Sequence, residues 1–228
     1  MQPSPQFLAV SNFQDFVSTP LKGAMNAICW KRDLLGDFGE IVNKVELNGN
    51  ITELTIEVLQ SLDLSERGQL ARDIIINDFE LLSAHGASPS INVIKSYERD
   101  NDFSFISTDV YSFHVDRSPI PVDTFLCTYY GDASDIVPNS QAIQKILVPE
   151  IRAALKKLYH GDEEGFDAFL IENFFDLHYE LLPNANPTNL GNGNLWRLAT
   201  DYPNSDVLPC VHRAPNEISG LNRLMLIC

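Results

Sequence analysis

The chain has 228 residues, of which 31 are acidic and 16 are basic, so its formal net charge is −15. This charge argues against nucleic acid or an anionic membrane as a partner, because binding to phosphates needs a basic surface. The length and the 44% of hydrophobic residues are those of one folded globular domain, which we expect over residues 1–228.

No targeting or membrane segment is evident in the sequence. The first residues, Met-Gln-Pro-Ser-Pro-Gln, lack the basic and apolar regions of a secretory signal. No apolar run approaches the roughly 18 residues that a membrane-spanning helix needs. The cysteines are scattered through apolar runs, as in a protein with reduced, buried thiols: Cys29, Cys127, Cys210 and Cys228. A cytoplasmic location is therefore predicted, and the oligomeric state stays open.

In chain order, the first predicted elements are helices. Apolar residues recur at helical spacing over residues 36–47 and again over 52–62. Asp63, with Glu66 three residues later, resembles a capping box, which predicts the start of a helix that runs to residue 84. Residues 1–88 are therefore expected to form a mainly helical cover.

The rest of the chain, residues 89–228, is expected to be rich in strands. Alternating and apolar runs bounded by turn residues predict strands over residues 91–97, 103–106, 110–114, 124–130, 195–200, 208–212 and 223–228. A helix pair is expected at about 139–182, over residues 139–159 and 163–182. A run of helices followed by a run of strands indicates an α+β fold.

Two histidines and one aspartate have spacings that suit a metal site. His114 and Asp116 stand two residues apart at the end of a predicted strand, where alternation points both side chains to one face. His212 ends another predicted strand. Two histidines and one carboxylate can bind Fe(II) on one side and leave positions open for substrates. The alternative for Asp116 is a turn or helix-cap residue before Arg117.

The other histidines have ordinary local roles. His85 and His160 each precede a glycine at the end of a predicted helix, which is common at helix C-termini. His178 stands in an aromatic run within a predicted helix and is expected to be packed or partly exposed. His114 and His212 are left without a local role, and satisfied core or surface histidines remain the alternative for them.

Arg223 stands at the start of the last predicted strand, eleven residues after His212. A guanidinium at this place could hold a dicarboxylate co-substrate in a two-pronged grip. The alternative is a surface salt bridge, which stabilises little. Arg213 and Arg197 are rival carboxylate binders, but Arg213 adjoins His212 and would face away from it on a straight strand.

Thr128 and Tyr130 are two residues apart in the predicted strand 124–130 and are expected to share one of its faces. Their hydroxyl groups could hydrogen-bond the same co-substrate. The alternative is that both residues reflect only the preference of threonine and tyrosine for strands.

At these motifs the sequence resembles an uncharacterised bacterial protein family. The pattern of that family is a Phe-His-x-Asp strand, a Thr-Tyr-x-Gly strand end, and a His-Arg-x-Pro with a following Arg-Leu-Leu strand. The corresponding segments here are residues 113–116, 128–131, 212–215 and 223–226, and an Asn-x-x-Cys-Trp segment at 26–30 also fits. Residues 132–134, Asp-Ala-Ser, depart from the family's Gly-Thr-like continuation. The family implies no activity.

More broadly, the order His-x-Asp, His, Arg is similar to that of Fe(II)/2-oxoglutarate-dependent dioxygenases. This resemblance implies a double-stranded β-helix (jelly-roll) core with N-terminal helices and an inserted helix pair. It also implies Fe(II) and 2-oxoglutarate as cofactors, with an unknown small molecule as the substrate to be oxidised. Because one fold hosts many functions, two alternatives stay open. They are a cupin-type metal-dependent hydrolase or isomerase, and a non-catalytic binding protein on the same scaffold.

Overall fold

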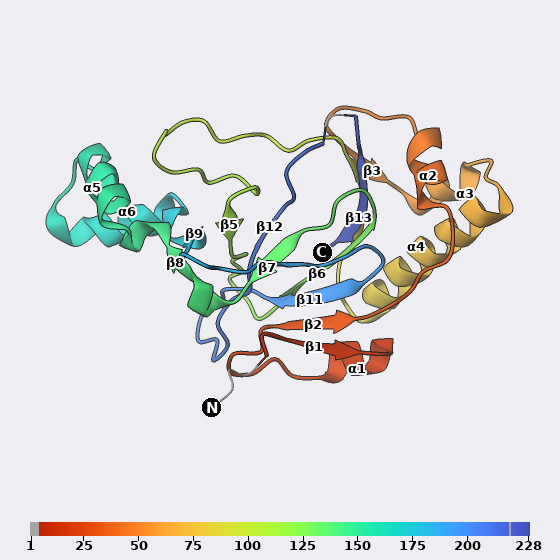
Figure 1. Ribbon diagram of the computed structural model, residues 1–228, viewed down its shortest axis with the longest axis horizontal. Coiled ribbons are helices and arrows are strands. Elements are labelled where there is room, and N and C mark those ends of the chain that lie inside the picture. The colour runs from red at the N-terminus through yellow and green to blue at the C-terminus, as the bar shows by residue number, and fades with distance from the viewer. Residues whose placement is uncertain (1–4, 219) are drawn as a thin grey trace.

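A computed structural model describes residues 5–218 and 220–228 of the chain. These residues form a mixed α+β fold with two β-sheets and six α-helices. Figure 1 shows the sheets in the middle and a group of helices at either side. One group contains α2 (Phe38–Lys44), α3 (Ile56–Ser61) and α4 (Glu66–Ala84), and the other contains α5 (Pro149–Leu158) and α6 (Phe166–Glu172). The remaining helix, α1 (Phe13–Ser18), lies beside the N-terminal strands.

The two sheets are built almost entirely from antiparallel neighbours. The larger sheet has the order β1 (Phe7–Val10), β2 (Ala27–Trp30), β11 (Leu195–Ala199), β6 (Asp123–Tyr130), β13 (Arg223–Ile227), β4 (Ser90–Ile94) and β3 (Ile51–Leu54). The smaller sheet has the order β10 (Thr188–Asn189), β7 (Asp135–Val137), β12 (Val211–Arg213), β5 (Phe113–His114), β9 (His178–Leu181) and β8 (Ala142–Gln144). Among these pairs only β1 and β2 run parallel.

Alternation along the strands separates the apolar residues into layers. Phe125 and Cys127 of β6 belong to the core that packs under helices α2 to α4. Leu126 points to the opposite face and joins a second core, to which Ile136 and Cys210 on the side of the smaller sheet also belong. One face of the larger sheet therefore packs under helices α2 to α4, and the other contributes to an apolar core between the two sheets.

Helix α4 begins two residues later than the sequence suggested. Its N-cap is Ser65, whose side chain accepts a hydrogen bond from the N–H of Gly68. Glu40 of α2 accepts hydrogen bonds from the backbone and the hydroxyl of Ser65. The predicted capping box from Asp63 to Glu66 was therefore wrong. Ser65 is the cap because it can satisfy an N–H group of the first turn and also contacts the neighbouring helix α2.

The described residues 5–88 contain three strands in addition to the predicted helical cover. Residues 51–54 form β3, not the start of a helix, because they pair with β4. Thr55 then caps α3 by accepting a hydrogen bond from Val58. Residues 103–106 form no strand, and Phe103 and Phe105 pack against the apolar cluster of α5 and α6 instead.

The helix pair expected at residues 139–182 is present, but its helices α5 and α6 are much shorter than the predicted spans 139–159 and 163–182. The region consists of β8, α5, α6, β9 and short 3-10 helices at Asn139–Gln141, Lys145–Leu147, Glu163–Gly165 and Phe175–Leu177. Helix α6 ends at Glu172, and Phe174 has a left-handed φ of 59°, which is uncommon for a residue other than glycine. The chain then enters β9, which pairs with β5. His178 therefore lies on a strand.

The expectations about cysteines and membrane segments can be compared with the structure directly. All four cysteines are free, and Cys29, Cys127 and Cys210 are buried, so the prediction of buried thiols is confirmed for these three. In the described residues, no helix combines the length and the apolar character required to cross a membrane.

Candidate metal centre

The two predicted histidine ligands lie side by side in the smaller sheet. His114 at the end of β5 is paired directly with His212 of β12. Their sequence neighbours Phe113 and Val211 belong to an apolar cluster on the opposite face of this sheet. Both imidazoles therefore point into the space between the two sheets, because successive strand residues alternate between faces. Their ring centroids are 4.5 Å apart.

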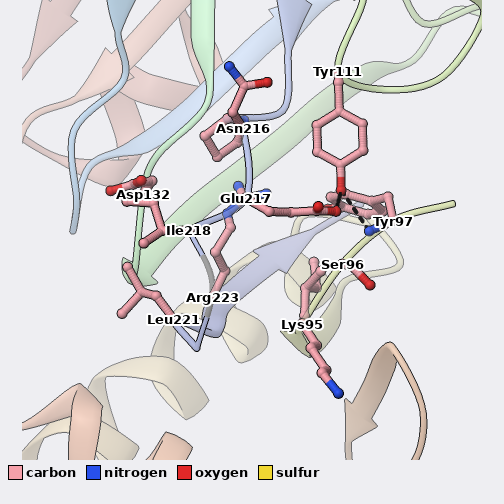
Figure 2. Close-up of a pocket in the computed structure, with 12 residues that line it drawn as sticks. Lys95, Ser96, Tyr97, Tyr111, Asp132, Asn216, Glu217, Ile218, Leu221 and Arg223 are labelled. Carbon is pink, nitrogen blue, oxygen red and sulfur yellow. Dashed lines mark hydrogen bonds between the residues drawn. The ribbon is translucent and has the colours of Figure 1, made fainter. Parts of the chain in front are cut away.

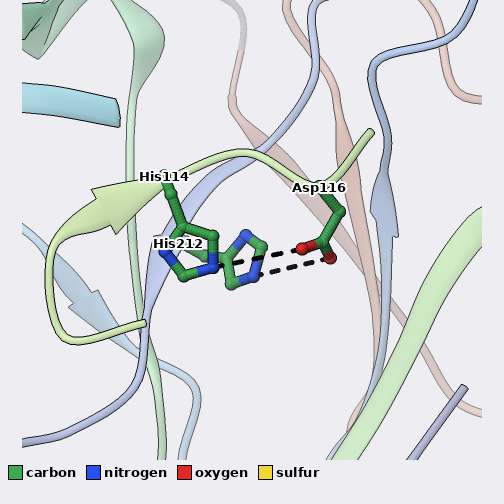
Figure 3. A group of neighbouring side chains, drawn as sticks. All are labelled: His114, Asp116 and His212. Atoms are coloured by element: carbon green, nitrogen blue, oxygen red, sulfur yellow. Dashed lines mark ion pairs between the residues drawn. The ribbon is translucent and has the colours of Figure 1, made fainter. Parts of the chain in front are cut away.

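Asp116 completes the group from the segment that follows β5 (Figure 3). Its carboxylate oxygens lie 4.0 Å from Nε2 of His114 and 3.6 Å from Nε2 of His212. One potential ligand atom from each residue falls within 4.8 Å of the other two. A single ion can contact all three atoms at ligand distances of about 2.0–2.2 Å after small side-chain adjustments. The sequence-predicted ligand set is thus brought together.

The orientation of each imidazole is set by a backbone carbonyl group. Nδ1 of His114 lies 2.8 Å from the carbonyl oxygen of Ser112, and Nδ1 of His212 lies 3.1 Å from that of Cys210. A carbonyl oxygen can only accept, so Nδ1 is the protonated nitrogen in both rings. Each Nε2 faces Asp116 and, in the neutral ring, has a free lone pair. Metal-binding histidines usually donate their other ring N–H to an acceptor of this kind.

Asp116 is itself held by the larger sheet. Thr124 of β6 donates a hydrogen bond from its hydroxyl to the carboxylate, at 2.5 Å. Burial acts to raise the pKa of Asp116, but the neighbouring His212 and the Thr124 hydroxyl outweigh it and lower this pKa below its ordinary value. The carboxylate is therefore ionised at neutral pH, as a metal ligand must be. The side chain of Asp116 lies at this site, which does not fit its alternative role as a turn or helix cap.

His114 is kept in the neutral form that a ligand requires. Burial and, to a smaller extent, the neighbouring His212 lower the pKa of His114 to about 4, against the opposing effects of Ser112 and Asp116. An imidazole with this pKa offers its lone pair to a cation at any pH near neutrality. Protonation therefore does not compete with metal binding under physiological conditions.

Arg223 and Thr128, the two predicted co-substrate contacts, are buried polar residues of the larger sheet. Arg223 shares its face of β13 with Met225, which packs in the core between the sheets. Its guanidinium Nη2 lies 3.4 Å from the Ser134 hydroxyl. Within the described residues, Arg223 Nε and Thr128 Oγ1 have no hydrogen-bond partner. Thr128 lies opposite Met225, so both unpartnered groups belong to adjoining strands and the same face.

A pocket next to Arg223 is separate from the three candidate ligands. It is lined by Tyr97, Tyr111 and Glu217 as well as Arg223 (Figure 2), and none of His114, Asp116 and His212 contributes to this lining. The Tyr111 hydroxyl donates to the Glu217 carboxylate. Arg223 therefore stands between this pocket and the space between the sheets.

Tyr130 does not share a face with Thr128. The register between β6 and β13 shifts at this point, so that Met225 is opposite Thr128 but Leu224 is opposite Tyr130. The extra residue turns Tyr130 to the side of helix α2, where its ring approaches Gly39. A β-bulge inserts one residue and reverses the alternation beyond it. The prediction that Thr128 and Tyr130 share one face of the strand was therefore wrong.

The rival arginines are engaged elsewhere. Arg213 forms an ion pair with Asp135 at 3.0 Å and lies over the ring of Phe113. Arg197 pairs with Asp123 at 2.5 Å and donates to backbone carbonyl groups of the segment that ends α1. Both guanidinium groups therefore have structural partners, which leaves Arg223 as the arginine with free donor capacity facing the space between the sheets.

His178 is a residue that the sequence-based reasoning missed. It lies opposite His114 in the pairing of β5 with β9, and the centroids of these two rings are 5.8 Å apart. Burial lowers the pKa of His178 to about 3, with further contributions from His114 and Lys145. The side chain is thus a buried, neutral imidazole next to the candidate metal ligands.

The chain matches none of the protein-family models with which it was compared, and it has no significant similarity to curated proteins or to solved structures. The resemblance to a bacterial family therefore stays a prediction. The chemistry of the site must be argued from its own residues. Two imidazoles and one carboxylate on one side of an ion suit a divalent transition metal and leave coordination positions free for other molecules.

Proposed function

We propose that this protein is a metal-dependent oxygenase, which uses Fe(II) and 2-oxoglutarate to hydroxylate a small molecule. The observation that carries the proposal is the convergence of His114, Asp116 and His212 within 4.8 Å. Both Nε2 lone pairs are available there, because the Nδ1 atoms are held by carbonyl groups. Two histidines and a carboxylate with open positions are the ligand set of non-haem Fe(II) oxygenases.

The co-substrate half of the proposal depends on Arg223 and Thr128. Their unpartnered polar atoms are buried on one face of adjoining strands, and a buried polar group without a partner costs about 1–3 kcal/mol. A carboxylate that accepts hydrogen bonds from both groups would remove this cost. Thr124, which contacts Asp116, precedes Thr128 by four residues of β6, or about 13 Å along the strand. A long arginine side chain and a five-carbon diacid together can bridge this separation.

We also propose that the central strands form a double-stranded β-helix. Eight strands support it, in the spatial orders β4-β13-β6-β11 and β5-β12-β7-β10. When the eight are taken in chain order, the first pairs with the last, the second with the seventh, the third with the sixth and the fourth with the fifth. These pairs are β4–β13, β5–β12, β6–β11 and β7–β10, all antiparallel. This nested order is that of a long hairpin rolled into two sheets, as in a jelly roll. β1, β2, β3, β8 and β9 are then additions at its edges.

The proposed reaction consumes one molecule each of dioxygen, 2-oxoglutarate and substrate. One oxygen atom enters a C–H bond of the substrate as a hydroxyl group, and the other enters succinate as CO₂ leaves the 2-oxo acid. The oxo acid and the substrate each supply two of the four electrons that dioxygen takes up. Bound Fe(II) would supply the redox chemistry. The chain's own contributions are the three ligands, the Arg223 clamp and an apolar space that excludes water.

The experiment that tests this function follows succinate. Protein freed of metal should be loaded with Fe(II) without oxygen, given 2-oxoglutarate and then exposed to air. Succinate should form with wild-type protein and not with His212→Ala, because removing one ligand abolishes the site. Succinate formation that is independent of added Fe(II) would contradict the proposal. Binding of Zn(II) without any affinity for 2-oxoglutarate would instead favour a hydrolase, in which the ion activates water.

A further inference from the structure

His178 is the third member of a row of histidines across the smaller sheet. His212 of β12 is paired with His114 of β5, and His114 is paired in turn with His178 of β9. Directly opposite residues of neighbouring antiparallel strands point to the same face. The flanking residues Leu177 and Tyr179 pack in the apolar cluster on the other face. His178 therefore faces the space between the sheets, on the same side as the candidate metal ligands.

The spacing within this row separates ligands from non-ligands. The His114 and His212 rings, 4.5 Å apart, supply the nitrogen atoms of the compact candidate group. The ring of His178 lies farther from that of His114, at 5.8 Å, and His178 is not part of that group. His178 therefore lies beside the candidate ligand group and is not part of it.

His178 is buried without a complete set of hydrogen bonds. His178 is only 5% exposed, and within the described residues its Nδ1 has no hydrogen-bond partner. Most buried polar atoms in folded proteins have a partner, and each exception needs an explanation. A phenylalanine or leucine would pack here without that cost. The imidazole therefore suits a partner that is not part of this chain.

The charged groups around His178 indicate what such a partner contains. The charged side chains whose fields act on His178 are those of Lys145, Asp109 and Asp100. Both carboxylates already accept hydrogen bonds from backbone N–H groups of their own loop. Lys145 donates to the 107–112 segment twice and keeps one of its three donors. The unused hydrogen-bonding capacity around His178 thus belongs to donors, which favours an oxygen-bearing or anionic ligand.

We propose that His178 binds the small molecule that occupies the open positions beside His114, Asp116 and His212, through a hydrogen bond to an oxygen or anionic atom of that molecule. This role rests on the metal site of the proposed function. It requires neither that the resident ion is iron nor that 2-oxoglutarate is the co-substrate. A test with another ion and another anion can therefore separate the two proposals.

The probe is azide, titrated into protein loaded with Co(II) and followed by the visible absorption of the bound Co(II). His178→Leu should weaken azide binding at least about tenfold, because a hydrogen bond to a charged ligand is lost. The affinity for Co(II) itself should stay within about threefold of the wild type. His178→Gln, which retains a donor, should recover most of the azide affinity. His160→Leu, at an exposed position, is the matched control and should behave as wild type.

A purely structural role of His178 predicts a different set of results. In that case His178→Leu would lower the melting temperature and leave azide affinity unchanged, and this result would overturn the proposal. We expect the melting temperature of His178→Leu to equal or exceed that of the wild type, because leucine needs no partner. Titration of 2-oxoglutarate into the same samples separates the proposals. If azide binding depends on His178 but 2-oxoglutarate does not bind, only the co-substrate assignment fails. A wild type that binds no Co(II) overturns both.

Discussion

His114 and His212 are paired directly across two antiparallel strands, with their ring centroids 4.5 Å apart. The candidate metal centre thus depends on one strand register. A slip of one residue between β5 and β12 would turn one imidazole to the opposite face of the sheet. Val211 and Phe113 are buried on that opposite face. They oppose such a slip, because it would turn one of them out of its apolar cluster.

The hydrogen bond from Thr124 to Asp116 should support metal binding. Thr124→Val keeps the shape of the side chain but leaves one carboxylate oxygen without its donor. Loss of a group that hydrogen-bonds a metal ligand typically lowers metal affinity by about 10–100-fold. The expected fall can be measured by competition with a chelator for Mn(II).

The matched control for this change is Thr200→Val. Thr200 is also buried, and its hydroxyl donates to the carbonyl oxygen of Val122 at 2.7 Å. Its replacement should cost about 1 kcal/mol of unfolding free energy and leave Mn(II) affinity unchanged. Equal metal affinities in Thr124→Val and Thr200→Val would show that the Thr124 contact has no part in ligand positioning.

Arg223→Leu should weaken 2-oxoglutarate binding while metal affinity stays near normal. Truncating one partner of a desolvated charge pair costs about 2–5 kcal/mol, so the loss should exceed tenfold. Calorimetric titration of 2-oxoglutarate into Mn(II)-loaded protein measures it. Arg213→Leu, which removes the ion pair with Asp135, should lower stability only. If the two variants bind 2-oxoglutarate equally, Arg223 is not the carboxylate clamp.

Sequence reasoning reached the ligand set because strand alternation is local. The spacing of His114 and Asp116 is enough to put both on one face, and a second strand ending in His212 supplies the third group. Tyr130 was assigned to the wrong face for an equally physical reason. The bulge before it arises from the pairing of β6 with β13, and a pairing between distant segments leaves no mark in the local pattern.

His178 escaped notice because its segment has the composition of a helix. Residues 163–182 carry apolar side chains at helical spacing, but the left-handed backbone of Phe174 ends the helical part. A glycine at this position would have marked the end of the helix. Strand β9 then forms because it pairs with β5 and β8. The row of three histidines could therefore be recognised only from the fold.

A buried ion pair should stabilise the packing of helix α4 on the larger sheet. Asp78, fully buried on α4, accepts from Arg32 at 2.6 Å and from the Tyr129 hydroxyl at 2.7 Å. Asp78→Ala leaves the arginine buried without its partner, which typically costs about 3–5 kcal/mol. Tyr129→Phe should cost less, about 1–3 kcal/mol, since it removes one hydrogen bond.

Urea denaturation of the metal-free protein measures both effects on the unfolding free energy. Mn(II) affinity serves as the control and should not change, because neither residue contacts the candidate ligands. A cost of less than about 1 kcal/mol for Asp78→Ala would mean that water reaches this ion pair in solution.

The metal-free protein should lose stability as the pH falls from about 6.5. The pKa of His114 is about 4 and that of His178 about 3 in the folded chain, against an ordinary 6.5. Between those values the unfolded chain binds more protons than the folded chain, so the free energy of unfolding rises with pH. Above the ordinary value both groups are neutral in either state and contribute no slope.

The contribution of one histidine can be isolated with His178→Leu. The difference in unfolding free energy between wild type and variant should depend on pH from about 3 to 6.5 and level off above this range. Urea denaturation at a series of pH values gives this difference. A difference that is flat across the acidic range would show that His178 is hydrated and titrates normally.

The central claim is that His114, Asp116 and His212 hold one divalent ion. Equilibrium titration of metal-free protein with Mn(II) under anaerobic conditions tests it most directly. We expect one ion per chain, and a loss of binding in His114→Ala, Asp116→Ala and His212→Ala. His85→Ala should bind as the wild type does, because His85 packs against Phe13 and Phe125 instead. Undiminished Mn(II) binding in the three ligand variants would contradict the account, since the ion would then lie elsewhere on this acidic protein.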